Sequence, residues 1–282
     1  PMVEANPCEG VMTNIWGTVN TANHAVRYGA EKFVMISTDK AINPTNVMGA
    51  SKRIAELCVQ GFNADGSGTQ FIITRFGNVL GSNGSVIPLF REQIARGGPV
   101  TVTHPEMIRY FMTISEACRL VLQAATMGSG GEIYVFDMGQ QVKIDNLARR
   151  MIPLTGLVPD EDIKIVYTGL RPGEKLYEEL LTDTESTKMT KNEKIRIALA
   201  DDIDMSAVRN NVTALIKFAR RLDGQETVRV MKRIVPEFKS NNSEFEIFDI
   251  KEKSTAHDYE KYSPEREREA TPAGINGIYH TQ

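Results

Sequence analysis

The sequence has few cysteines and no long hydrophobic run. Cys8, Cys58 and Cys118 stand far apart without a CxxC pair, so neither a disulfide framework nor a zinc site is indicated, and a reducing cytoplasm fits best. No stretch of about 18 apolar residues occurs, and the first residues lack the pattern of a signal peptide. Because the formal net charge is -3, nothing favours a nucleic acid or an anionic membrane as a partner.

The residues that are present describe an ordinary globular chain. Of 282 residues, 41% are hydrophobic and 24% are charged, which is enough apolar material for one large core or two modest ones. The chain starts at Pro1 rather than at a methionine, and its first residues run directly into a helical pattern. We therefore expect a processed, truncated or cloned piece of a longer protein.

Hydrophobic periodicity predicts alternating helices and strands in the first third of the chain. Apolar residues three to four positions apart indicate helices over 8–28, 46–62 and 85–98. Short apolar and β-branched runs at 32–38 and 69–79 are typical of buried strands. Strands that alternate with helices favour a parallel sheet, so the expected fold class is α/β.

The rest of the chain has a different character. Beyond about residue 98 the elements become shorter and mix helices with strands, which indicates a smaller α+β lobe. We expect an α/β domain at 1–98, a smaller lobe at 99–240 and a boundary between them inside 76–100. Residues 250–282 are dominated by charge and have few groups to bury, so we expect a mobile tail there.

Several chemically active side chains follow the first predicted strand. Ser37, Thr38, Asp39 and Lys40 come at its carboxyl end, and Lys52 lies on the next helix. In open parallel sheets, ligands bind outside the carboxyl ends of the strands. A carboxylate and an amine at such a place are candidates for acid and base work. From the spacing alone, however, a surface turn followed by a solvated lysine is the stronger interpretation.

Resemblance to a known family changes that balance. The segments that carry it are "NPCEGVMTNIWGTVN", "STDKAINPTNVMGASKR", "TRFGNVLGSNGSVIPLF", "IRYFMTISEA" and "LRPGEKLYEEL". Together they resemble the extended short-chain dehydrogenases/reductases, in the polysaccharide biosynthesis branch that contains the UDP-N-acetylglucosamine 4,6-dehydratases. They cover roughly residues 3–185, and their order is more specific than any one motif. The resemblance implies that 1–98 is the C-terminal part of a Rossmann-like domain and that 99–240 mainly binds substrate.

Met48 departs from the pattern of the wider superfamily. A tyrosine precedes the lysine there in a YxxxK motif, whereas this chain has Met48-x-x-x-Lys52. Helical spacing of four places both side chains on one face, and a thioether cannot exchange a proton. Met48 could mark an inactive enzyme or simply pack in the core. We prefer a third interpretation, because a methionine here resembles the longer, membrane-anchored dehydratases of the same branch, and it implies a parent protein anchored to the inner membrane by upstream helices.

The resemblance implies an intramolecular redox elimination on a UDP-sugar, with NAD or NADP as the cofactor. Hydride leaves C4 of the sugar, water is lost across C5 and C6, and hydride returns to C6. Asp39 is then the acid for the C6 hydroxyl, Lys40 the base at C5, and Thr38 the partner of the C4 hydroxyl. The acceptor of the C4 hydroxyl proton stays open between Asp39 and a water chain. The expected cofactor contacts are Ser37, Lys52 on the nicotinamide ribose, Phe76 and Gly77.

Glycines at 77, 81 and 84 follow the second predicted strand, but their spacing does not fit GxGxxG. We assign this segment to the sugar nucleotide, with Asn78, Ser85 and Val86 close to its diphosphate at a helix N-terminus. No strand, GxGxxG and helix unit occurs in the chain, so we expect the adenosine-binding half upstream. The remaining expected substrate contacts are Thr101, Arg109 and Arg171 for the diphosphate or uridine, and Glu174 for the ribose.

Three functions compete at this stage. A nucleotide-sugar 4,6-dehydratase uses both Asp39 and Lys40, whereas a nucleotide-sugar 4-epimerase shares the hydride chemistry but needs no acid for a C6 leaving group. A noncatalytic sugar-nucleotide or protein-binding module is favoured by Met48 and by the missing glycine loop. The resemblance also implies a homo-oligomer formed through the helices at 9–28 and 46–63, and no metal site is expected.

Overall fold

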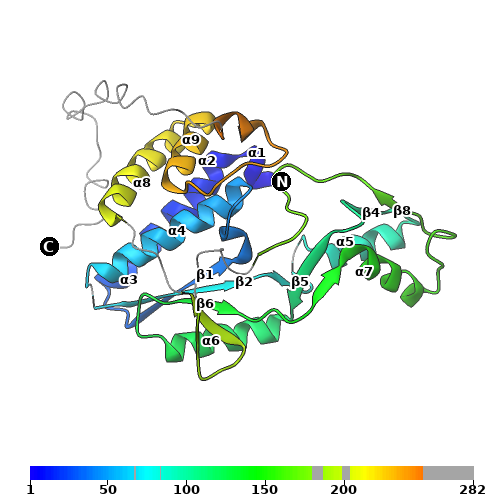
Figure 1. The fold of residues 1–282 in the computed structure, drawn as a ribbon, viewed down its shortest axis with the longest axis horizontal. Coiled ribbons are helices and arrows are strands. Elements are labelled where there is room, and N and C mark those ends of the chain that lie inside the picture. Colours follow the sequence, from blue (N-terminus) through cyan, green and yellow to red (C-terminus); the bar gives the residue numbers. More distant parts are fainter. Residues whose placement is uncertain (67, 83, 180–186, 199–203, 250–282) are drawn as a thin grey trace.

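A five-stranded mixed sheet forms the centre of the computed structural model (Figure 1). Its strand order is β1-β2-β6-β10-β9. Strands β1, β2 and β6 are parallel, and β10 runs antiparallel to both of its neighbours, β6 and β9. The structure describes residues 1–66, 68–82, 84–179, 187–198 and 204–249. The strands are β1 (Lys32–Thr38), β2 (Gln70–Phe76), β6 (Ile133–Phe136), β9 (Thr187–Met189) and β10 (Ile195–Ala198).

The two predicted strands form the parallel part of this sheet. β1 and β2 pair along their whole length, from Lys32 opposite Gln70 to Thr38 opposite Phe76. β2 is almost entirely buried, whereas β1, at the edge of the sheet, is only partly buried. Their carboxyl ends therefore lie side by side, and the α/β prediction is confirmed.

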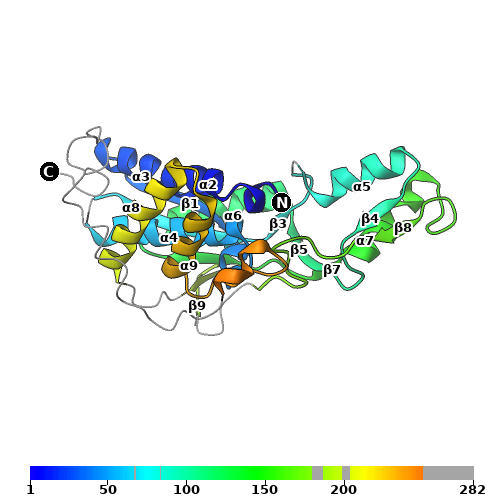
Figure 2. The same cartoon turned by 90° about the horizontal axis from the view of Figure 1, so that it is seen from above.

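Helices cover the two faces of the sheet unequally (Figure 1), and Figure 2 looks down on the face that carries most of them. One face carries most of the helices, and α6 covers the other by packing against β1 and β2. The predicted helix at 8–28 is confirmed, although part of it has π geometry. The helices are α1 (Met2–Ala5), α2 (Pro7–Gly10), η1 (Val11–Trp16), α3 (Gly17–Arg27), α4 (Val47–Ala64) and α6 (Ile114–Met127).

Two late helices, α8 (Met205–Arg220) and α9 (Gly224–Ile234), pack as a hairpin against η1, α2 and α4. Their apolar side chains join the largest core of the chain, and Thr227 contacts the thiol of Cys8 at 3.6 Å. The Arg220 guanidinium stacks on the Trp16 ring at 4.9 Å. The chain thus covers, with its own helices, part of the surface that was expected to bind a second subunit.

A smaller body extends from the carboxyl ends of the sheet, with a core of its own around Phe90, Val100 and Ile144. β4 pairs in parallel with β8, and β5 joins β3 to β7. The elements are β3 (Asn78–Val79), α5 (Val86–Ala95), β4 (Val100–Val102), β5 (Ile108–Met112), β7 (Gln141–Lys143), α7 (Ile144–Met151), η3 (Pro153–Thr155) and β8 (Ile165–Tyr167).

The chain passes between the two bodies more than once. The segment 99–240 contributes β6, β10, α6, α8 and α9 to the large body, because the sheet is completed only when the chain returns from the small one. The predicted boundary after residue 98 therefore separates the elements only in part. The predicted tail at 250–282 lies outside the described residues. Among the described residues, no helix is both long and apolar enough to cross a membrane.

Candidate active site

The carboxyl end of β1 brings the predicted Thr38, Asp39 and Lys40 into one hydrogen-bonded group. A short 3-10 turn, η2 (Asp39–Ala41), follows the strand. The Thr38 hydroxyl and the Lys40 ammonium both donate to Oδ1 of Asp39, each at 2.9 Å. The Asp39 side chain is fully buried, and Lys40 is 21% exposed. The sequence thus folds an acid and an amine into direct contact at the edge where parallel sheets bind ligands.

The second carboxylate oxygen of Asp39 has no hydrogen-bond partner, although it is buried. It lies against the backbone of Gly77, where an added Cβ atom would stand only 2.8 Å away. A buried oxygen without a hydrogen bond is unfavourable by about 1–3 kcal/mol, and such atoms concentrate where a ligand completes the structure. Oδ2 of Asp39 is therefore available to a polar group of a substrate.

Two further polar side chains meet the Lys40 ammonium. Asn78, on β3, accepts from it at 3.3 Å and donates to the Tyr110 carbonyl at 3.0 Å. Glu178 approaches it at 3.8 Å and is itself buried. Asn78 was predicted near the substrate diphosphate, and in the structure its side chain lies beside Lys40, which also contacts Asp39.

Glu178 was missed by the sequence analysis. Burial raises the pKa of its carboxyl above the ordinary glutamate range, and nearby Asp39 adds to this effect, while Lys40 and Arg109 oppose it. The only signal was its place in "EKLYEELL", where Glu178 and Glu179 are adjacent. Nothing local distinguishes the buried acid from its exposed neighbour, because the difference depends on contacts with residues far away in the sequence.

Helix α4 presents Met48 and Lys52 close to the end of β1. Asn46 caps this helix by accepting from the Gly49 amide at 2.8 Å. Lys52 donates to the Ile36 carbonyl at 3.1 Å, and burial lowers the pKa of its ammonium, an effect that Glu56 partly opposes. Met48 is half-buried one helical turn before Lys52 and offers no exchangeable proton.

A buried ion pair supports the strand ends from the α4 side. Glu56 accepts from Arg75 through both oxygens, at 2.8 and 2.6 Å, and from Arg53 at 3.1 Å. Burial alone would raise the pKa of Glu56, but the two arginines and the Ser37 hydrogen bond together lower it. Ser37 donates to Glu56 at 2.6 Å. Ser37, predicted as a cofactor contact, therefore tethers β1 to α4.

The other predicted cofactor residues lie at the end of β2. Phe76 stacks on Phe136, with ring centroids 5.6 Å apart and planes 4° from parallel. The Gly77 amide donates to the Met138 sulfur at 3.2 Å. Gly77 therefore sits between Met138 and Asp39, at the same edge as Lys40.

Ser85 and Val86, which were predicted to lie close to the diphosphate, are found at the start of α5. Ser85 is the N-cap of α5, and its hydroxyl oxygen is buried without a partner. Val86 is the first residue of the helix and packs against the core of the small body. The free amides at a helix N-terminus suit an anion.

The remaining predicted substrate residues are held by the protein itself. Thr101 exchanges two hydrogen bonds with Gln93, at 2.7 and 3.0 Å. Arg109 donates to three backbone carbonyls at 2.7–3.1 Å, so its fork joins β5 to the segment after residue 174. Arg171 is exposed and pairs with Glu174 at 3.5 Å. Of these residues, Arg109 approaches the group of Asp39 and Lys40 through Glu178, which it faces at 3.7 Å.

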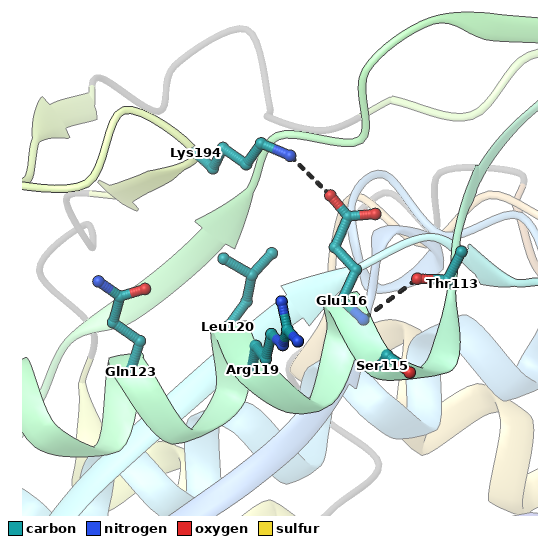
Figure 3. Close-up of a pocket in the computed structure, with 7 residues that line it drawn as sticks. All are labelled: Thr113, Ser115, Glu116, Arg119, Leu120, Gln123 and Lys194. Carbon is teal, nitrogen blue, oxygen red and sulfur yellow. Dashed lines mark hydrogen bonds and ion pairs between the residues drawn. The ribbon is translucent and has the colours of Figure 1, made fainter.

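Two hollows lie on the α6 side of the sheet. The larger, about 380 Å³, contains no predicted site residue, and its Lys194 and Glu116 pair with each other at 2.8 Å. Figure 3 shows its seven lining residues, which are Thr113, Ser115, Glu116, Arg119, Leu120, Gln123 and Lys194. The smaller, about 270 Å³, includes Met138, which also contacts Gly77. Only the smaller hollow therefore reaches towards the candidate site.

Comparison with known proteins identifies the family. Residues 1–200 match the family described as polysaccharide biosynthesis protein. The chain belongs to this family. The match spans β1, α4, β2 and the small body, so it includes the whole group around Asp39 and Lys40. The predicted resemblance is confirmed.

Individual relatives carry different names. The capsular polysaccharide biosynthesis protein CapD of Staphylococcus aureus is 54% identical over 230 residues, which are 78% of this chain and 38% of CapD. A UDP-N-acetylglucosamine 4,6-dehydratase (inverting) of Campylobacter jejuni is 37% identical, covering 66% of this chain and 54% of that protein. A UDP-glucose 4-epimerase of Rickettsia rickettsii is also 37% identical, covering 67% and 54%. The chain thus spans well under half of CapD and about half of the other two.

A solved structure shares the fold of this family member. Pen from Bacillus thuringiensis superimposes with a TM-score of 0.64 at 34% sequence identity, covering 76% of this chain and 71% of that chain. Neither body alone contains 76% of the residues of this chain, so the similarity extends over both bodies. The predicted Rossmann-like α/β architecture with a smaller lobe is confirmed.

Proposed function

We propose that this chain carries the catalytic centre of an NAD(P)-dependent nucleotide-sugar 4,6-dehydratase. The substrate would be UDP-N-acetylglucosamine, the product a UDP-4-keto-6-deoxy sugar, and the pathway the synthesis of a surface polysaccharide or glycan. The observation that carries the proposal is the contact of Lys40 with Asp39 at 2.9 Å, beside a buried Asp39 oxygen without a partner. The named activity of the Campylobacter relative supports it.

The residues at the strand ends fit a nicotinamide ribose. Lys52 is held at one hydrogen atom by the Ile36 carbonyl, which leaves its other two donors for ribose hydroxyls. Phe76 and Gly77 flank the same edge. When bound, the nicotinamide supplies reversible hydride acceptance between C4 and C6 of the sugar. Ser37 stays a predicted member of this set, and its hydroxyl donates to Glu56.

The elimination needs an acid and a base, and the contact of Lys40 with Asp39 supports assigning both roles to this pair. Transfer of a proton from Lys40 to Asp39 along their 2.9 Å hydrogen bond produces a neutral acid and a neutral amine. Lys40 then removes the C5 proton while Asp39 protonates the departing C6 hydroxyl as water. These two transfers restore the original ion pair. When hydride returns to C6, Lys40 would give a proton back to C5 and would then regain the proton released from the C4 hydroxyl, so the protein ends the reaction unchanged. Thr38 would hold the C4 hydroxyl.

A 4-epimerase is the second candidate, because the Rickettsia relative carries that name at equal identity. Epimerisation at C4 breaks no C6 bond and gives the pair of Asp39 and Lys40 no evident task. Met48 leaves the acceptor of the C4 hydroxyl proton open between Asp39 and a water chain, as before. A noncatalytic module would be supported by Met48 and by the missing glycine loop.

An NMR time course tests the proposal with the full-length gene product, UDP-N-acetylglucosamine and either NAD or NADP. A 4-keto, 6-methyl sugar establishes the dehydratase, a C4 epimer establishes the alternative, and unchanged substrate contradicts both. Asp39→Asn should reduce product formation at least about 100-fold, because it removes the acid, while cofactor binding is retained. Asp160→Asn is the control, since Asp160 is exposed and its carboxylate contacts Arg149 and the Ile165 backbone rather than the group around Asp39.

Other expectations stay predictions. They are the cytoplasmic location of the reaction, the membrane anchoring of a longer parent protein, the choice between NAD and NADP, and a homo-oligomeric state. Size-exclusion chromatography with light scattering would measure the last of these. The face covered by α8 and α9 makes a different subunit contact necessary if the oligomer forms.

A further inference from the structure

The Lys40 ammonium is surrounded by three oxygen acceptors from three parts of the chain. Asp39 Oδ1 lies at 2.9 Å, Asn78 Oδ1 at 3.3 Å and Glu178 Oε1 at 3.8 Å. An ammonium has three hydrogen atoms, so two can form the hydrogen bonds to Asp39 and Asn78 while the third faces Glu178 at ion-pair distance. Both buried carboxylates keep one oxygen without a hydrogen bond, Asp39 Oδ2 and Glu178 Oε2.

The contacts of Lys40 change when it gives a proton to Asp39. The neutral amine keeps two hydrogen atoms, and the two acceptors left for them are Asn78 and Glu178. Its lone pair then faces the side of Asp39, which is also the side on which the sugar would lie if Asp39 reaches the C6 hydroxyl. A base needs its lone pair fixed in this manner, because small misplacements of a reacting group cost large factors in rate.

Glu178 is well suited to remain in place during this change. Arg109 faces it at 3.7 Å while bound to three backbone carbonyls, so that the guanidinium is fixed. The charged groups that act on Glu178 are Lys40, Asp39, Arg109 and Lys175. None of these groups donates a hydrogen bond to Glu178 Oε2.

We propose that Glu178 is a positioning residue, which holds the Lys40 amine so that its lone pair points at the C5 proton of the sugar. The proposal rests on the dehydratase function proposed above. It adds a carboxylate from the "EKLYEELL" segment to the acid and base from the end of β1. Its effect is on the orientation and protonation of Lys40, and Glu178 does not itself react.

The test compares Glu178→Gln with Glu179→Gln. Glu179 is the adjacent, exposed acid, and it pairs with Lys175 and Asn43. We expect kcat to fall at least tenfold in Glu178→Gln, with KM within twofold, and neither value to change in Glu179→Gln. Burial raises the pKa of Glu178. The kcat of the unaltered enzyme should therefore decrease as the pH is lowered, and the decrease should begin at a pH above the usual glutamate range. Glu178→Gln should not show this decrease.

A second measurement does not depend on turnover. Acetylation of Lys40 by acetic anhydride, followed by mass spectrometry, reports how readily its amine reacts. Glu178→Gln should raise the rate at Lys40 at least threefold, because no carboxylate then opposes loss of its proton from that side, and Glu179→Gln should leave it unchanged. Equal Lys40 rates in both variants, with equal melting temperatures, would overturn the proposal even if the dehydratase activity itself were absent.

Discussion

Substitution of Glu56, which forms a buried ion pair with Arg75, tests what holds the carboxyl end of β1 in place. Glu56→Gln keeps the volume of the side chain and one acceptor oxygen but removes the negative charge. Arg75 is 1% exposed and loses the charge of Glu56, and removal of one partner of a buried ion pair costs about 3–5 kcal/mol. Since glutamine still accepts one hydrogen bond, we expect a loss of about 3 kcal/mol in the free energy of unfolding.

The same pair predicts a pH dependence with a definite sign. The pKa of Glu56 is lower in the folded protein than in the unfolded chain, where a glutamate titrates near about 4.3. Its contribution is therefore complete above about pH 5 and is lost as the pH falls towards the folded pKa. The difference between the unaltered chain and Glu56→Gln should be constant near neutrality and should narrow in acid.

Urea unfolding followed by circular dichroism measures both effects. Glu92→Gln is the control, because Glu92 forms an exposed pair with Arg96 and should change the free energy by no more than about 0.5 kcal/mol. Of the two variants, only Glu56→Gln changes the acceptor of the hydrogen bond that Ser37 donates. A loss below about 1 kcal/mol, or a difference that grows in acid, would refute the reasoning.

Two further predictions concern the site and its frame. Gly77→Ala places a Cβ atom 2.8 Å from the buried Asp39 oxygen, so activity should fall by about 100-fold, measured by product NMR, with the melting temperature nearly unchanged. Full activity in this variant would show that Asp39 moves freely. Arg109→Ala removes a guanidinium bound to three carbonyls and should lose about 2–3 kcal/mol in urea unfolding. Arg171→Ala, at an exposed pair, should lose about 0.5 kcal/mol or less, and equal losses for the two arginines would contradict their assignment.

The elements that the sequence predicted well are those with local causes. β1 occupies the predicted residues 32–38, because its central run from Phe33 to Ile36 is apolar and favours an extended strand. α4 begins where Asn46 can cap it, one residue from the predicted start. The group of Thr38, Asp39 and Lys40 was found for the same reason, since its members are consecutive in the chain.

The features that were missed depend on contacts between distant segments. Glu178 is buried because its segment returns to Lys40 across more than a hundred residues. Ser37 was assigned to the cofactor because nothing in the strand pattern reveals its partner Glu56 on the next helix. Arg109 was expected to bind the diphosphate, yet three carbonyls occupy its guanidinium. Residue type and order predict which groups are present, whereas their partners come from the tertiary fold.

The hairpin of α8 and α9 bears on how the protein can be cut. The family match ends at residue 200, and α8 starts at Met205, so a fragment designed on the family boundary would lose both helices. Val11, Ile15 and Leu57, which are buried in the intact core, would lose apolar neighbours there and become more open to water. Exposed apolar surface of this kind promotes aggregation. A soluble crystallisation or assay fragment should therefore extend at least to Phe248, the end of η4 (Glu244–Phe248).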